Sequence, residues 1–186
     1  MDTSSGVKAS VHIAGPTVLD SGRELIRVKD PVALVIFGAS GDLSKRKLIP
    51  ALYQLQKSGY LPDRYAILGF SRTEMTDESY REDTLRELQN QIDSSAKAVQ
   101  VDNPLITALY YQPGNNNDLE SFKKLKEKLE KLDKKLSLPG NRLFYLSVAP
   151  KFFTMIIQNL CAAGLICGKQ DNAWSRVIIE KPFGHD

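Results

Sequence analysis

The sequence contains little cysteine and little histidine, and these shortages exclude several classes of site. Its two cysteines, Cys161 and Cys167, are too few for a disulfide framework, and their spacing matches neither a zinc pair nor a redox Cys-x-x-Cys motif. Because both lie in an apolar stretch, we expect buried free thiols in a reducing compartment. The two histidines, His12 and His185, have no ligand partner at a suitable spacing, so we expect no metal site.

A strong net charge and a long hydrophobic run are also missing. The net charge is +3, from 25 Lys and Arg against 22 Asp and Glu, and the two signs are interspersed over most of the chain. Such a balance does not favour binding to nucleic acid. No stretch approaches the roughly 20 apolar residues of a membrane helix, and residues 1–30 lack the apolar core of a secretory signal. We therefore expect neither nucleic acid nor a membrane as a partner.

What the sequence does contain is an apolar run, residues 32–37, that stops at Gly38-Ala39-Ser40-Gly41 and continues into a basic, helical pattern. A buried strand that ends at Gly-x-x-Gly and leads into a helix is typical of phosphate-binding turns in α/β proteins. The small residues let the backbone approach the ligand, and the helix start offers unpaired N–H groups. The full Gly-x-Gly-x-x-Gly spacing is absent, so a plain strand-to-helix turn remains the alternative.

Four further strand-like runs alternate with helical patterns along the 186 residues. Because the runs are mostly apolar rather than alternating, they predict a parallel sheet buried on both faces. The predicted fold is α/β: a Rossmann-like, doubly wound parallel sheet with helices on both faces and a ligand crevice at the carboxyl ends of its strands. Residues 1–30, rich in Ser, Gly and Thr, are expected to form a partly disordered extension to a domain of residues 31–186. The predicted strands cover residues 33–37, 65–70, 109–112, 142–148 and 174–180.

The helical patterns carry their own local predictions. Leu48, Leu52 and Leu55 recur at helical spacing after the glycine turn and predict a helix from about Leu43 to Lys57. Asn103-Pro104 is expected to break a weak helical segment, and Asp118 to cap the clearest helix of the chain. The apolar residues of that last helix fall on one stripe: Leu119, Phe122, Leu125, Leu129, Leu132 and Leu136.

The end of the second strand bears on the choice of coenzyme. NAD-binding folds place an Asp or Glu there, which accepts a hydrogen bond from the ribose 2′-hydroxyl. Here Ser71-Arg72-Thr73 follows, with no acid before Glu74. Because Arg72 offers a planar fork of donors to a 2′-phosphate, we predict NADP rather than NAD. An exposed arginine at a helix start is the alternative.

Two lysines need separate interpretations. Lys181, in Glu180-Lys181-Pro182, follows the fifth strand and is expected to point into the crevice, with a surface lysine as the alternative.

Tyr53 and Lys57 match the Tyr-x-x-x-Lys pair of short-chain reductases. That pair acts far later in those chains, so here it is interpreted as structural.

Four blocks of this sequence stand in the order and spacing of a known family: Gly-Ala-Ser-Gly-Asp-Leu-Ser-Lys (38–45), Gly-Phe-Ser-Arg-Thr (69–73), Asn-Arg-Leu-Phe-Tyr-Leu-Ser-Val-Ala-Pro (141–150) and Arg-Val-Ile-Ile-Glu-Lys-Pro-Phe-Gly (176–184). Together they resemble the coenzyme domain of glucose-6-phosphate dehydrogenases. The resemblance runs from about residue 31 to the end of the chain, and the Glu-Lys-Pro-Phe-Gly block is its most specific part.

The resemblance implies an oxidoreductase of the oxidative pentose phosphate pathway. Such an enzyme oxidises glucose 6-phosphate to 6-phosphogluconolactone in the cytosol, passes a hydride to NADP, and works as a homodimer or homotetramer. Arg72 would meet the 2′-phosphate of NADP. Lys181 would be catalytic and would touch the sugar phosphate. The other residues implied to bind the coenzyme are Gly38, Ala39, Ser40, Gly41, Asp42, Leu43, Ser44, Lys45, Val148, Ala149, Glu180 and again Lys181.

One departure from the family concerns length. In this family the catalytic base and most ligands of the sugar phosphate lie in a second, α+β domain after the Glu-Lys-Pro-Phe-Gly block, and this sequence ends two residues beyond that block. We therefore expect the coenzyme-binding part alone, without turnover. A self-sufficient NADP-binding or sensing module is the alternative.

Overall fold

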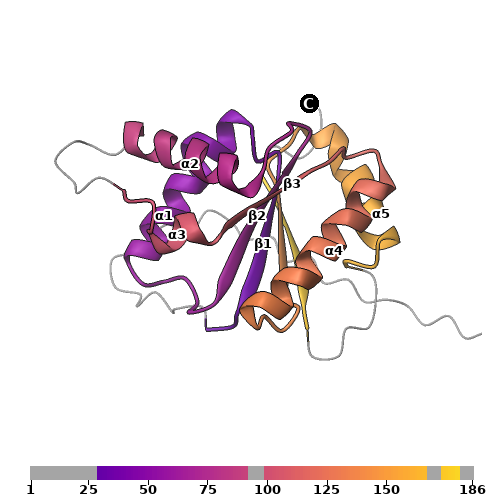
Figure 1. The fold of residues 1–186 in the computed structure, drawn as a ribbon. Coiled ribbons are helices and arrows are strands. Elements are labelled where there is room, and N and C mark those ends of the chain that lie inside the picture. The colour runs from indigo at the N-terminus through magenta and orange to yellow at the C-terminus, as the bar shows by residue number, and fades with distance from the viewer. Residues whose placement is uncertain (1–28, 92–98, 167–172, 181–186) are drawn as a thin grey trace, which may run out of the picture.

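A five-stranded parallel sheet forms the centre of the computed structural model, which describes residues 29–91, 99–166 and 173–180 (Figure 1). The strand order is β3-β2-β1-β4-β5. The chain therefore builds outward from β1 to β3 and then crosses back to place β4 beside β1, so the order reverses between β1 and β4. This confirms the predicted doubly wound sheet. The strands are β1 (Val32–Phe37), β2 (Tyr65–Ser71), β3 (Leu109–Pro113), β4 (Arg142–Leu146) and β5 (Ser175–Ile179).

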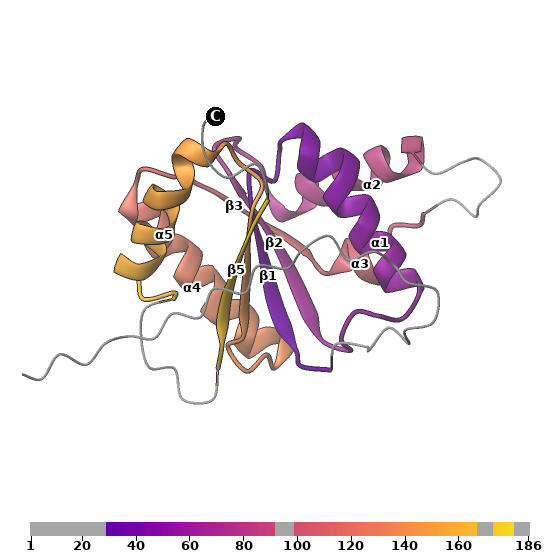
Figure 2. The ribbon, with the colours of Figure 1, turned by 180° about the vertical axis from the view of Figure 1, so that it is seen from behind.

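Helices cover both faces of this sheet, as predicted (Figures 1 and 2). One face carries a single π-helical turn, η1 (Ser44–Leu48), with α1 (Ile49–Lys57), α2 (Asp77–Gln91) and the short α3 (Pro104–Thr107). The other carries α4 (Leu119–Leu136) and α5 (Phe153–Ala162), which the 3₁₀ turn η2 (Pro150–Phe152) introduces. Within the described ranges, no helix has the length and apolar character needed to cross a membrane.

The clearest predicted helix, α4, has the expected start and core face. The Asp118 side chain accepts hydrogen bonds from the N–H groups of Glu120 and Ser121, at 3.2 and 3.1 Å. The helix ends at Ser137, whose φ of +52° is left-handed. Phe122, Leu125, Leu129 and Leu132 are buried against the sheet, and the stripe prediction is confirmed for them.

The helix predicted after the glycine turn is confirmed, since η1 and α1 together span residues 44–57. Its buried face carries Ile49, Leu52 and Tyr53, whereas Leu55 is 41% exposed. Asn103-Pro104 begins helix α3: the Asn103 side chain accepts from Leu105 N–H at 2.9 Å, and proline suits a first helical turn. The weak helical segment expected before Asn103 falls largely on residues 92–98, outside the described residues, and stays a prediction.

The fifth strand and Cys161 differ from expectation. β5 is an edge strand and only partly buried; Ile178, for example, is 38% exposed. Cys161 is half-buried near the end of α5 and is disulfide-bonded, so the prediction of a free thiol is wrong for this residue. The chain turns just after Cys161, at Gly164 with a φ of +71°. The apolar neighbourhood from which a free thiol was predicted does not prevent a disulfide bond at such a turn. Cys167 lies outside the described residues, as do both histidines.

The opposite edge of the sheet, β3, is covered by charged side chains. Arg81 Nε donates to Leu109 O at 2.8 Å, and Tyr111 N–H donates to Asp77 Oδ1 at 2.7 Å. Lys128 Nζ donates to Tyr111 O. Because an open strand edge can pair with another chain, this cover protects β3 from edge-to-edge association.

Candidate functional site

Four of the predicted segments meet at the carboxyl edge of the sheet. Gly38 N–H donates to Phe70 O at 2.9 Å, and Ser147 N–H donates to Phe37 O at 3.0 Å. The turn after β1 therefore touches the ends of both β2 and β4. Glu180 follows β5, the next strand outward. Because all five strands are parallel, segments that are distant in sequence become neighbours here.

The turn after β1 is built so closely that only glycine fits at its start. Gly38 has a φ of +81°, and a Cβ there would lie 2.2 Å from Ser147 O. Gly41 N–H donates to Gly38 O at 2.9 Å and closes the turn. A Cβ at Gly41 would lie 3.1 Å from the same carbonyl oxygen. The predicted role of these two glycines in a tight turn therefore has a direct steric reason.

The helix that leaves this turn begins with unused hydrogen-bond donors. Within the described ranges, no acceptor is found for the backbone N–H groups of Asp42, Leu43 and Ser44. The buried hydroxyls of Ser44 and Ser147 also lack a partner there. Buried polar groups are seldom left unpaired, and N–H groups at a helix start attract anions. The donors at this turn therefore fit an anionic group such as a phosphate.

Two of the nearby cations already have carboxylate partners. Lys45 Nζ lies 2.6 Å from Asp83 Oδ2, and Arg46 lies 2.6 Å from Asp42, with both members of that second pair exposed. Burial by itself raises the pKa of the Asp83 carboxyl. The hydrogen bonds and charges of Lys45 and Arg86 outweigh that effect and hold the pKa below its ordinary value. Lys45 is thus held in place by α2 and directed toward Asp83.

Arg72 differs from these cations. Its side chain is exposed, and it has no hydrogen bond or ion pair with any residue that the structure describes. The segment on which it stands is nevertheless anchored, because Ser71 Oγ lies 2.8 Å from Ser40 Oγ in the glycine turn. The guanidinium therefore remains free to bind an anion next to the turn.

Four hydroxyl-bearing side chains surround the backbone of Arg72: Ser40, Ser71, Thr73 and Tyr111. Besides the Ser40–Ser71 contact, Ser71 Oγ lies 2.7 Å from Tyr111 OH, and Thr73 Oγ1 donates to Ser40 Oγ at 3.0 Å. Tyr111 OH donates to Thr73 O at 2.7 Å. These contacts join the ends of β1, β2 and β3.

At the β4 and β5 end of the site, the Tyr145 hydroxyl donates to the Glu180 carboxylate. Burial, and then the hydrogen bond and charge of Glu180, raise the pKa of Tyr145, so it stays protonated and can keep donating. Val148 is half-buried beside Gly38, and Ala149 is exposed. Lys181 lies outside the described residues, and its assigned role stays a prediction.

Sequence reasoning missed Tyr111, Tyr145 and Asp83. Tyr145 lies inside the block of residues 141–150, and the resemblance of that block to the family is the signal that could have pointed to it. Tyr111 and Asp83 carry no local signal, because their partners are 38 to 40 residues away. Tyr53 is buried in the core, which fits its structural interpretation.

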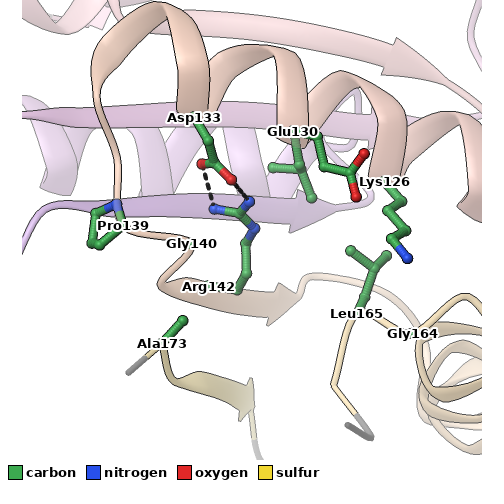
Figure 3. Close-up of a pocket in the computed structure, with 10 residues that line it drawn as sticks. Lys126, Glu130, Asp133, Pro139, Gly140, Arg142, Gly164, Leu165 and Ala173 are labelled. Atoms are coloured by element: carbon green, nitrogen blue, oxygen red, sulfur yellow. Dashed lines mark hydrogen bonds and ion pairs between the residues drawn. The ribbon is translucent and has the colours of Figure 1, made fainter. Parts of the chain in front are cut away.

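A separate cavity of about 250 Å³ lies at the amino ends of β4 and β5, away from this site (Figure 3). Its lining includes Lys126, Glu130 and the Arg142 guanidinium, which Asp133 binds with both carboxylate oxygens. Arg142 is buried, and the pair joins the start of β4 to α4. Because these charges satisfy each other, they connect the two elements and offer no free group to a ligand.

Comparison with known proteins identifies what this arrangement is similar to. The family model described as "Glucose-6-phosphate dehydrogenase, NAD binding domain" matches residues 35–186. Glucose-6-phosphate 1-dehydrogenase of Chlamydia pneumoniae is 43% identical over 162 residues, which cover 86% of this chain and 31% of that protein. The chloroplastic glucose-6-phosphate 1-dehydrogenase 1 of Arabidopsis thaliana is 33% identical over 191 residues, 100% of this chain and 31% of its own length.

A solved structure agrees with these relatives. It is titled "Glucose-6-phosphate dehydrogenase in complex with its substrate glucose-6-phosphate" and matches with a TM-score of 0.71 and 31% sequence identity, over 87% of this chain and 32% of that one. The chain thus spans about a third of the length of the relatives that it matches.

Proposed function

The chain belongs to the glucose-6-phosphate dehydrogenase family, and on this premise we propose that it binds NADP at the carboxyl edge of its sheet. The family model describes a nicotinamide dinucleotide site, and the preference for NADP over NAD is our proposal. The N–H groups after Gly41 and the buried Ser44 hydroxyl, which have no partner in the part of the chain that the structure describes, support an anion at the turn.

The observation that carries the choice of NADP is the exposed Arg72 side chain, which stands where an NAD-binding fold has a carboxylate. A carboxylate at this position would accept from a 2′-hydroxyl and repel a 2′-phosphate. Arg72 instead offers an exposed guanidinium beside the glycine turn, with no hydrogen bond or ion pair to any described residue. Charge-assisted, forked hydrogen bonds from arginine are strong and suit a phosphate.

Other residues of the site have proposed roles in holding the coenzyme. Residues 38–45 would hold its phosphates, Val148 and Ala149 would lie beside it, and Glu180 would lie near the nicotinamide, steadied by Tyr145. We assign Lys181, the next residue, to catalysis and to the sugar phosphate. When bound, the nicotinamide supplies a hydride acceptor. The residues of this chain would bind the coenzyme and orient its nicotinamide ring.

The activity is proposed for the whole protein, because this chain covers about a third of its relatives. That activity is oxidation of glucose 6-phosphate to 6-phosphogluconolactone with NADP, in the oxidative pentose phosphate pathway. A relative of known structure carries glucose-6-phosphate as its substrate, which supports this substrate class. We also propose a cytoplasmic homodimer or homotetramer for the whole protein.

The variant Arg72→Ala tests the coenzyme proposal in the 186-residue chain. Loss of charge-assisted hydrogen bonds should weaken NADP binding by about 1.5–3 kcal/mol. NAD, which has no 2′-phosphate, should bind nearly as before. Isothermal titration calorimetry with both coenzymes measures the two affinities.

Arg64→Ala is the matched control. Arg64 is also exposed and stands at the opposite end of β2, where it donates to Ser137 O at 2.8 Å. This variant should leave both affinities unchanged. Equal losses for NADP and NAD in Arg72→Ala would overturn the assignment of Arg72 to the 2′-phosphate.

A further inference from the structure

The four hydroxyls around Arg72 form a closed ring whose direction can be deduced. A carbonyl oxygen can only accept, so Tyr111 OH must donate its single proton to Thr73 O. Tyr111 then accepts from Ser71, and Ser71, having used its proton, accepts from Ser40. Ser40 in turn accepts from Thr73 Oγ1. Each of the four hydroxyls donates once, and those of Ser40, Ser71 and Tyr111 also accept once. The ring begins at the Thr73 hydroxyl and closes at the Thr73 carbonyl.

The ring holds Arg72 from both sides along the chain. Ser71 precedes Arg72 and is bound by Ser40 and Tyr111 through its side chain, while its carbonyl accepts from Gly114 N–H at 2.9 Å. Thr73 follows Arg72 and is bound through both its hydroxyl and its carbonyl. The backbone of Arg72 is thereby fixed, although its own side chain makes no hydrogen bond or ion pair with the described residues.

Tyr111 is the rigid member of this ring. It is 1% exposed, its ring lies 4.9 Å from that of Tyr80, and Gly69 makes room for it, since a Cβ there would lie 3.0 Å from Tyr111 Cδ2. Its backbone N–H and C=O are held by Asp77 and Lys128. Chiefly through burial, the pKa of its hydroxyl is raised, so the donor is retained at neutral pH.

We propose that Tyr111 is a positioning residue for coenzyme selection: its hydroxyl closes the hydrogen-bond ring that sets the backbone of Ser71, Arg72 and Thr73 and so presents the Arg72 guanidinium to the 2′-phosphate. This inference rests on the proposed NADP function. An anchored arginine loses less conformational freedom on binding than a mobile one, so the ring increases the affinity for the 2′-phosphate specifically.

The variant Tyr111→Phe removes only the hydroxyl. NADP affinity should fall about fivefold, the change that corresponds to one net hydrogen bond. NAD affinity should change by less than about twofold, because NAD does not use Arg72. In a chain that already carries Arg72→Ala, adding Tyr111→Phe should leave NADP affinity within about twofold, since the effect acts through Arg72. Calorimetric titration of all four proteins measures this cycle.

Tyr110→Phe is the matched control. Tyr110 is the preceding residue of β3 and belongs to the core on the other face of the sheet, where its ring lies 5.1 Å from Arg81 and 5.4 Å from Lys135. It should leave both coenzyme affinities unchanged. Should Tyr111→Phe fail to fold, Thr73→Val decides, because it opens the ring at an exposed position and should weaken NADP binding without affecting NAD.

The outcomes separate the two proposals. If the unmodified chain binds NADP no better than NAD, the proposed function fails. If the unmodified chain prefers NADP, and Arg72→Ala removes that preference while Tyr111→Phe preserves it, the role of Tyr111 is overturned. The role of Tyr111 is also overturned if Tyr111→Phe lowers NADP affinity equally in the chain with Arg72 and in the chain that carries Arg72→Ala.

Discussion

The face of the sheet under α4 and α5 is filled mainly by phenylalanine and leucine, whereas the face under α1, α2 and α3 buries three tyrosines among aliphatic residues. Of these three, Tyr111 makes polar contacts with Ser71 and Thr73. On the first face, the Phe37 ring lies 5.0 Å from that of Phe70 and 5.7 Å from that of Phe122. On the second face, Tyr80 is fully buried, yet its hydroxyl has no partner among the described residues.

The two faces contribute differently: one mainly stabilises the fold, and the other orients the loops of the site. Apolar contacts are non-directional, so the phenylalanine face stabilises the fold without selecting one loop geometry. Hydrogen bonds and ion pairs are directional, and those of the second face lead to the loops of the site: Tyr111 to Thr73, and Asp83 to Lys45. The α4 face also contains a directional contact, the Arg142–Asp133 pair, but that pair lies at the start of β4, away from the site. The directional contacts that reach Arg72 and the glycine turn come from the second face.

The largest effect is expected from Phe122→Ala, which would break the phenylalanine face. Truncating a fully buried phenylalanine leaves a cavity and should lower the free energy of unfolding by about 3–5 kcal/mol. Urea unfolding measures this loss. The ratio of NADP to NAD affinity should stay constant in the folded fraction, since the hydroxyl ring is untouched. Loss of the preference for NADP would contradict the conclusion that this face stabilises the fold without orienting the site.

Leu55→Ala is the control for this prediction. Because Leu55 is exposed, its truncation should change the free energy of unfolding by less than about 0.5 kcal/mol.

A smaller loss of stability, with a large loss of binding, is expected from Gly38→Ala. The left-handed φ and the contact with Ser147 O should cost about 1–3 kcal/mol in unfolding free energy and displace the turn from β4. Gly59→Ala is the control, because Gly59 has a φ of +73° but open space around it. Thermal unfolding and coenzyme titration of both variants should show that only Gly38→Ala loses coenzyme binding. Equal losses of binding in the two variants would show that the close approach of Gly38 to Ser147 O is unimportant.

The smallest effect is expected from Asp83→Asn, and it depends on pH. The pKa of Asp83 is lower in the folded chain than its ordinary value of 3.8, so the carboxylate stabilises the fold above that value, and the contribution disappears as the pH falls through the folded pKa. Asp83→Asn should therefore lose about 0.5–1 kcal/mol at pH 6. Urea unfolding at pH 6 and in the acid range below 3.8 measures the difference.

The control for that prediction is Asp42→Asn, which removes the exposed partner of Arg46. Exposed pairs contribute little, so its unfolding free energy should be nearly unchanged at both pH values. A pH-independent loss in Asp83→Asn would show that the Lys45 pair does not carry the effect.

Much of the fold could be predicted because its signals are local. Continuous apolar runs predicted the strands, a 3–4 residue apolar spacing with Asp118 predicted α4, and Gly38 predicted the turn after β1. The error at Cys161, which was predicted to be a free thiol, has a different origin. An apolar neighbourhood does not show whether a thiol is paired, because pairing depends on the position of the partner in space.

By itself, the sequence determined the strands, the glycine turn and the presence of an arginine rather than an acid after β2, because each depends on residue type and spacing within a short window. Only the tertiary structure decided that Tyr111 closes a ring around Arg72, that Asp83 holds Lys45 and that Tyr145 meets Glu180. Those pairs lie 35 to 40 residues apart. The parallel sheet brings the carboxyl ends of separate strands to one edge, and such contacts have no signature in any local pattern.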